Sequence, residues 1–446
     1  MRKPVFPRIL GLLVLYCAVF AALVLIQFGK GNVRQTGAAQ KKFNPADFVI
    51  TQAQSAQTFN EALDRWRDQS FAFWSRTAAR HSDEDTVIAY NADSVRRGVY
   101  RTATASTPAA FRSGSRRSYR SSVYLGGMAQ AQRSFTAAEQ ETLSRLSRLI
   151  SEKSLDILKE NRVFEFLLLR GLTDQVTGAL ESLRSIDAAV LTLEYCPGIF
   201  EAYADVRSLF PQAENPLEPL IAPACNLVAG GLVKDAERDT VLAYRDGAAE
   251  SELNLRLGKA LWTWAGDTGG DWAALGRSLV LSVLSLADDS GAVPALVPAE
   301  GGETSEDTDN RISAALLYRI LNPGEFYPRA AAIVSGADNI WAWTASPLVS
   351  AAQNGESLDI SVSFPVNETH YMIIRGLRPF VRLQLYNIDY RSDPQFERYD
   401  SSGWVYYPDD QILVLKMKHR TAVEHIRIFF REQRSASASG VETLES

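Results

Sequence analysis

The chain has 446 residues, enough for two to four domains, and its 46% hydrophobic and 22% charged residues are typical of a globular protein. A formal net charge of −5 gives no indication of a nucleic-acid partner. The chain has only three cysteines, so at most one intramolecular disulfide can form. Cys196 and Cys225 could pair in an oxidising compartment or remain buried free thiols, and the sequence leaves both possibilities open.

The first 30 residues carry the strongest signal in the chain. Residues 9–28 contain no Asp, Glu, Lys or Arg, and as a helix they would span about 30 Å, the thickness of a bilayer core. A cleaved secretory signal is the alternative, but its apolar region usually runs about 7–15 residues. We therefore predict a cytoplasmic leader and uncleaved anchor over 1–29. The short cationic leader favours a single-pass protein of the cytoplasmic (inner) membrane with a cytoplasmic N-terminus and an extracytoplasmic bulk.

After a polar tether at 30–57, residues 58–133 are predicted to form one helix and a basic, β-rich region. Thr58 and Glu61 have the spacing of a capping box, which predicts a helix from there to about residue 79. Three later segments carry β-branched and aromatic residues between polar breaks. They predict strands at 86–90, 98–104 and 118–126.

The same region has an unusual charge distribution. Residues 94–138 contain eight arginines and no acidic residue, although the whole chain is acidic. Arginine pairs bidentately with phosphate and carboxylate, so an anionic lipid or envelope glycan is a possible partner. The alternative is a solvated basic edge, or one that contacts the acidic part of the chain. The residues proposed for the patch are Arg112, Arg116, Arg117 and Arg120.

Residues 134–349 are predicted to form a domain of helical hairpins. Thr136 and Glu139 have capping-box spacing before a long amphipathic stretch. The clearest unit comprises 250–264 and 271–287, which are joined by a short glycine-rich segment that favours antiparallel packing. Three tryptophans near this segment could form a sugar-stacking platform or pack in the core: Trp262, Trp264 and Trp272.

The apolar pattern changes to a period of two after residue 350. This alternation predicts an antiparallel β-sandwich over 350–432, followed by a disordered tail at 433–446. The expected fold class is therefore α+β and multidomain.

Two resemblances accompany this organisation. Residues 257–284, Phe326-Tyr-Pro-Arg and residues 362–390 resemble a family of membrane-anchored envelope proteins of spirochaetes to which no activity is assigned. This resemblance implies class and location. The order of a β-region, stacked helical hairpins and a small β-sandwich also resembles that of α/α-toroid (six-hairpin) glycosidases and polysaccharide lyases, although the helical part is shorter than a complete toroid.

A glycosidase needs two carboxylates about 5–10 Å apart. The toroid resemblance places them in loops at helix ends, where the candidates are Glu194, Asp267, Asp271 and Glu303 of the acidic loop at 300–309. Asp271 also stands where a carboxylate would complement a helix dipole. Glu194, inside an apolar stretch, is either a buried acid or a hydrogen-bonded one.

The remaining motifs give little support to other chemistry. None of the four histidines lies in the expected helical domain, which argues against a lyase, and no motif for a metal or cofactor site is present. Our leading hypothesis is a non-catalytic, membrane-anchored extracytoplasmic envelope protein that binds a glycan, an anionic lipid or another protein. The alternative is a carbohydrate-active enzyme of the glycoside-hydrolase type.

Overall fold

The computed structural model describes residues 43–77, 80, 83–112, 118–266, 270–299, 310–321, 326–335 and 339–431. The chain divides into two compact units, Met1–Asn44 and Pro45–Ser446, and the described helices and strands belong to the second. Within the described part, no helix is long and apolar enough to cross a membrane. The anchor predicted at 9–28 and the tail predicted at 433–446 lie outside the described residues.

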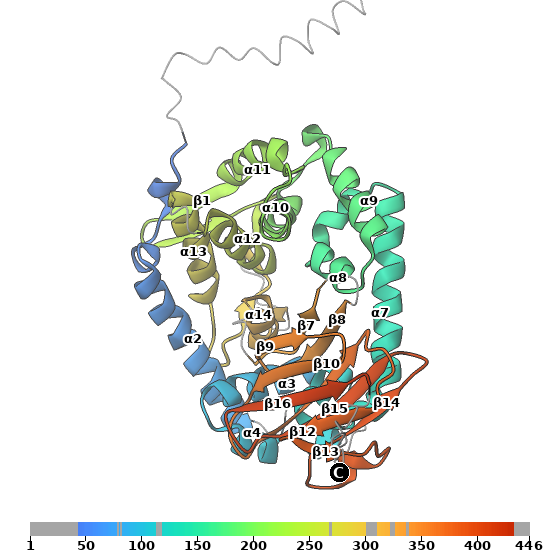
Figure 1. Ribbon diagram of the computed structural model, residues 1–446. Helices are drawn as coiled ribbons and strands as arrows, with labels where there is room; N and C mark the ends of the chain where they lie inside the picture. The colour runs from blue at the N-terminus through green and yellow to red at the C-terminus, as the bar shows by residue number, and fades with distance from the viewer. Residues whose placement is uncertain are drawn as a thin grey trace, which may run out of the picture. The chain divides into compact units, whose positions relative to one another are not determined.

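The second unit has an α+β fold, as expected (Figure 1). Helix α2 (Ala56–Thr77) confirms the first predicted helix. The capping residue is Ser55, however, because its Oγ accepts a hydrogen bond from the Thr58 amide at 3.1 Å. The capping box predicted at Thr58 and Glu61 is therefore wrong, and the helix begins earlier.

The strands predicted at 86–90, 98–104 and 118–126 are wrong, because these segments are helical. They lie in α3 (Glu84–Arg96), α4 (Tyr100–Ser106) and α6 (Tyr119–Leu125), and α5 (Ala109–Arg112) precedes α6. Every residue of α3 from Thr86 to Val95 is buried. A helix buried on all sides shows no 3.6-residue alternation, so its β-branched residues indicated a strand instead.

The long helix α7 (Met128–Ser151) starts after Gly127, which has a positive φ of 80°. Thr136 and Glu139 lie in its middle, so the second capping box is also wrong. The helices that follow are α8 (Val163–Leu169), α9 (Thr173–Arg184), α10 (Cys196–Leu209) and α11 (Glu218–Gly231).

The predicted helical hairpin is confirmed by α12 (Ser251–Ala265) and α13 (Asp271–Leu284), which lie side by side in Figure 1. The side chains of Leu261, Leu275 and Leu279 are fully buried there. The last described α-helix is α14 (Ala314–Leu321). The sequence did not predict the short strands around the hairpin. These strands are β1 (Leu232–Asp235), β2 (Thr240–Ala243), β3 (Ala248–Glu250), β4 (Val293–Pro294), β5 (Leu296–Pro298) and β6 (Arg311–Ile312).

Two five-stranded antiparallel sheets complete the described fold, in the orders β13-β12-β16-β10-β9 and β14-β15-β11-β8-β7. Apolar residues of both sheets share one hydrophobic core. The strands are β7 (Arg329–Val334), β8 (Ile340–Thr344), β9 (Leu348–Gln353), β10 (Ser357–Ser363), β11 (Thr369–Arg375), β12 (Arg382–Leu385), β13 (Ile388–Tyr390), β14 (Gly403–Tyr407), β15 (Ile412–Lys418) and β16 (Val423–Phe429). Strands β7 and β8 lie within the range 134–349 that was predicted to be a domain of helical hairpins, so that range extends too far toward the C-terminus.

Aromatic rings join α6 and α7 to strand β8. The ring of Tyr119 lies 5.3 Å from that of Trp343, and the ring of Phe135 lies 5.9 Å from that of Trp341. At the start of α7, the Met128 amide donates to the Glu397 carboxylate at 2.9 Å. These contacts fix one face of α7 against the sheet, so side chains farther along α7 are held close to the ends of β8 and β11.

Candidate functional site

A cavity of about 420 Å³ lies between helices α7 and α8 and the sheet that contains β8 and β11. We call it the Glu139 groove. Its walls combine carboxylates, guanidinium groups and side-chain amides with a few apolar side chains, so a ligand here would be held mainly by hydrogen bonds. The residues that line it are Glu139, Gln140, Leu143, Leu169, Arg170, Leu172, Asn339, Trp341, Arg375, Gly376, Asp410 and Gln411.

Glu139 on α7 is the buried centre of the groove and contacts two arginines. Its Oε1 accepts a hydrogen bond from Arg170, and its Oε2 lies 3.1 Å from Nη2 of Arg375. The Arg170 guanidinium also lies over the rings of Phe166 and Trp341, at 3.5 and 4.4 Å. Burial lowers the pKa of Arg170, and the neighbouring Glu139 carboxylate opposes this shift. The arginines are thus held in fixed orientations, since carboxylate and ring contacts leave their planar forks little freedom.

The rim of the groove is polar and open to solvent. Gln140, Asp410 and Gln411 are exposed, whereas Asn339 is half-buried. Arg375 donates from Nη1 to the carbonyl oxygen of Asp410 at 3.0 Å, which ties the β15 hairpin to β11. Two arginines face two carboxylates here, so the formal charges of the lining balance.

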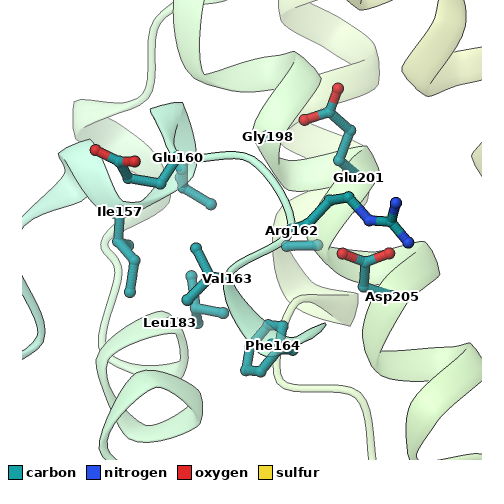
Figure 2. A pocket seen from close by; sticks show the side chains of 11 residues that line it. Ile157, Glu160, Arg162, Val163, Phe164, Leu183, Gly198, Glu201 and Asp205 are labelled. Atoms are coloured by element: carbon teal, nitrogen blue, oxygen red, sulfur yellow. The ribbon is translucent and has the colours of Figure 1, made fainter. Parts of the chain in front are cut away.

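A second polar cluster lies at α8 and α10, around a cavity of only about 20 Å³, room for one water molecule. Figure 2 shows the Arg162 side chain extending toward Asp205, with Glu201 one turn away on α10. Burial raises the pKa of both Glu201 and Asp205, and it lowers the pKa of Lys259. Carboxyl groups with raised pKa values are candidates for general acids.

The carboxylates proposed from the sequence have other surroundings. Glu194 is about one-third exposed and forms ion pairs with Arg245 at 3.1 Å and Lys159 at 3.7 Å. Of its two alternatives, the structure shows the hydrogen-bonded one, since Arg245 donates to it. Asp271 is exposed at the first residue of α13. Asp267 and Glu303 lie outside the described residues.

The three tryptophans contact other aromatic rings. Trp262 packs edge-on against Phe59 with 4.8 Å between ring centroids, and Trp264 lies 4.8 Å from Phe200. The Trp264 and Trp272 rings are inclined at 70° to each other. Such a pair forms no continuous flat surface on which a sugar ring could stack.

Of the four patch arginines, Arg120 alone has a side chain within the described structure. It forms an ion pair with Asp85 of α3, which also lies 3.6 Å from Arg319. The side chain of Arg112, and Arg116 and Arg117 entirely, lie outside the described residues. Arg120 therefore pairs with an acidic residue of the range 58–133 itself.

The sequence did not identify the groove or a buried histidine pair. His419 Nε2 lies 3.2 Å from His370 Nδ1, and both side chains are essentially inaccessible to solvent. Glu139 was taken as part of a helix cap, and Arg170 and Arg375 had no local motif. No spacing within the sequence indicates these contacts, because the partners come from separate elements.

Cys196 and Cys225 are free thiols, and burial raises their pKa values to about 12 and about 11. Among the described residues, no group of three or more histidines, cysteines and carboxylates is placed to hold a metal ion. No protein-family model and no curated protein matches this chain.

Proposed function

We propose that this chain is a single-pass, membrane-anchored protein of the cell envelope, similar to the spirochaete envelope proteins, and that it binds a glycan in the Glu139 groove. The observation that carries the proposal is the lining of this groove. A hydroxyl group both donates and accepts hydrogen bonds, so a sugar can use amides, carboxylates and guanidinium groups together. The groove offers all three in one cavity of about 420 Å³.

The charge balance of the groove favours a glycan over an anionic lipid. Arg170 and Arg375 share the Glu139 carboxylate, and Asp410 adds a second negative charge at the rim. A lipid headgroup would require an excess of basic side chains, which this lining does not have. Arg120, the one patch arginine whose contacts are described, is already paired with Asp85.

The test uses the full-length chain in detergent, mixed with purified sacculi and sedimented. We expect saturable binding that soluble glycan fragments compete away. Replacing the exposed rim amides in the double variant Gln140→Ala/Gln411→Ala should weaken the binding about thirtyfold, because two hydrogen bonds worth about 1 kcal/mol each are lost. Gln130→Ala is the matched control, because Gln130 is an exposed amide on the same helix outside the groove. Binding by the double variant equal to that of the wild type would contradict the proposal.

A carbohydrate-active enzyme is the second candidate, and the cluster at Glu201 and Asp205 supports it. Burial raises the pKa of both carboxyl groups, and a raised pKa is a property that a general acid needs. The adjacent cavity of about 20 Å³ is far too small for a sugar ring, which favours the binding function.

Assaying the released reducing ends separates the two candidates. The full-length chain is incubated with the same sacculi, and Glu201→Gln is compared with the wild type. If the wild type binds without releasing reducing ends, the binding function stands. If the wild type releases reducing ends, and Glu201→Gln abolishes this release but still binds the sacculi, the protein is an enzyme and the binding proposal is wrong.

A further inference from the structure

A separate cavity of about 280 Å³ opens on the loops at one end of the two sheets. We call it the Tyr386 pocket. It shares no residue with the Glu139 groove, so a ligand could bind here whether or not the groove holds a glycan. The residues that line the pocket are Asn367, Tyr386, Tyr390, Asp400, Ser401, Ser402, Lys418, His419 and Arg420.

Tyr386 stands in a strained turn at this pocket. Leu385 pairs with Ile388 across β12 and β13, so Tyr386 and Asn387 are the two central residues of a tight hairpin turn. Both have positive φ, 57° and 62°, as a type I′ turn requires. Asparagine and glycine adopt this conformation readily, but a bulky tyrosine does so only at a cost in backbone energy.

The side chain of Tyr386 is held from the other wall of the pocket. Its hydroxyl donates to the carbonyl oxygen of Lys418 and is hydrogen-bonded to the Ser402 hydroxyl. The Lys418 amide in turn donates to Ser402 Oγ at 2.8 Å. The ring is thereby fixed as a wall of the cavity, with the Tyr390 ring 6.2 Å away at 66°.

The pocket presents a guanidinium group that has no carboxylate partner. Arg420 is exposed, and its guanidinium lies 4.1 Å from the centre of the Tyr386 ring. In the part of the chain that the structure describes, no carboxylate lies within ion-pair distance of it. Lys418 adds a second cation, paired at 2.8 Å with Asp400, whose carboxylate is 92% exposed. The lining thus carries one excess positive charge, and stacking orients the free fork of Arg420.

We propose that the Tyr386 pocket binds the anionic group, a phosphate or a carboxylate, of a ligand about the size of a monosaccharide. The fork of Arg420 matches two oxygens of either group. Lys418 adds a point charge, and the Asn367 side chain and the Ser401 hydroxyl supply further polar contacts for the rest of the ligand. The tyrosine rings give the sugar an apolar wall.

The test measures binding of three sugars to the full-length chain in detergent by isothermal titration calorimetry at constant ionic strength. Glucose 6-phosphate and glucuronate distinguish phosphate from carboxylate, and glucose is the neutral probe. We expect at least one anionic sugar to bind saturably and more tightly than glucose. Arg420→Gln should weaken that binding about tenfold or more, because it removes a charge-assisted hydrogen bond.

Arg378→Gln is the matched control. Arg378 is also exposed and lies 4.2 Å from the centre of an aromatic ring, that of Phe430, but outside the pocket. The Arg378→Gln variant should bind the sugars like the wild type. The proposal is overturned if neither anionic sugar saturates, if glucose binds equally well, or if Arg420→Gln retains wild-type affinity.

Discussion

Gly258 of α12 and Gly276 of α13 face each other where the two helices cross. A Cβ atom added to Gly276 would lie 2.6 Å from the carbonyl oxygen of Gly258, and one added to Gly258 would lie 2.7 Å from that of Gly276. Gly258 also approaches Val280, and Gly276 approaches Trp262. The residue numbers in contact therefore increase along α12 as they decrease along α13. This is the pattern of antiparallel packing at unusually close range.

We predict that Gly276→Ala destabilises the protein by about 1–3 kcal/mol, because the added methyl group meets backbone atoms that cannot rotate away. Urea unfolding followed by circular dichroism measures the change. Gly230→Ala is the control, since Gly230 lies in helix α11 with open space around it. That substitution should be neutral or stabilise by up to about 1 kcal/mol. Equal effects of the two substitutions would show that the helices do not approach at Gly276.

Leu279 tests the same hairpin through its core. Its side chain is fully buried, so Leu279→Ala should cost about 2–5 kcal/mol of unfolding free energy through lost burial and the cavity left behind. Leu209→Ala removes the same atoms from a side chain that is 40% exposed and should cost much less. A change below about 0.5 kcal/mol at Leu279 would contradict the helical packing.

The sequence predicted the hairpin and most C-terminal strands because their apolar residues recur at the spacing of a helix or alternate along a strand. It failed for α3, where burial from Thr86 to Val95 leaves no polar face to reveal a helical period. It also failed for β7, whose sequence Arg-Ala-Ala-Ala-Ile-Val is rich in a helix-forming residue. Pairing with β8 along Arg329–Val334 determines that segment instead, and such pairing is not visible locally.

The sites were harder to predict than the fold. Glu139, Arg170 and Arg375 come from α7, the end of α8 and the end of β11, and tertiary packing alone brings them together. The same holds for His370 and His419, which are 49 residues apart in the sequence. Local patterns identified residue types that could bind a ligand, such as the tryptophans in and after α12. They did not predict the aromatic rings of other elements that these tryptophans contact.

A further prediction concerns the N-terminal segment. We expect residues 9–28 to remain in the mature protein as a membrane span, because they are uncharged, long enough to cross a bilayer and followed by no small-residue cleavage pattern. Intact mass and N-terminal sequencing of the protein extracted from membranes measure this. A mature terminus after Ala18 would contradict it.

The buried pair of His370 and His419 predicts a loss of stability in mild acid. Burial lowers the pKa of His419 to about 4 and the pKa of His370 well below its usual value. An unfolded histidine takes up its proton near pH 6.5, so between there and about pH 4 the unfolded state binds more protons than the folded one. The free energy of unfolding should therefore fall as the pH falls through this window, by about 3 kcal/mol for His419 alone.

Comparison with a variant isolates this effect, because other groups titrate in the opposite sense. Burial raises the pKa of Glu201 and Asp205, so these carboxyls bind protons in the folded state first and stabilise it as the pH falls. We expect His419→Gln to be less stable than the wild type at pH 7, and to lose less stability between pH 7 and about pH 4.5. His425→Gln is the control, since His425 is exposed and hydrogen-bonded to Ser361. Parallel pH profiles for His419→Gln and the wild type would show that the histidine pair does not stay neutral in the folded protein.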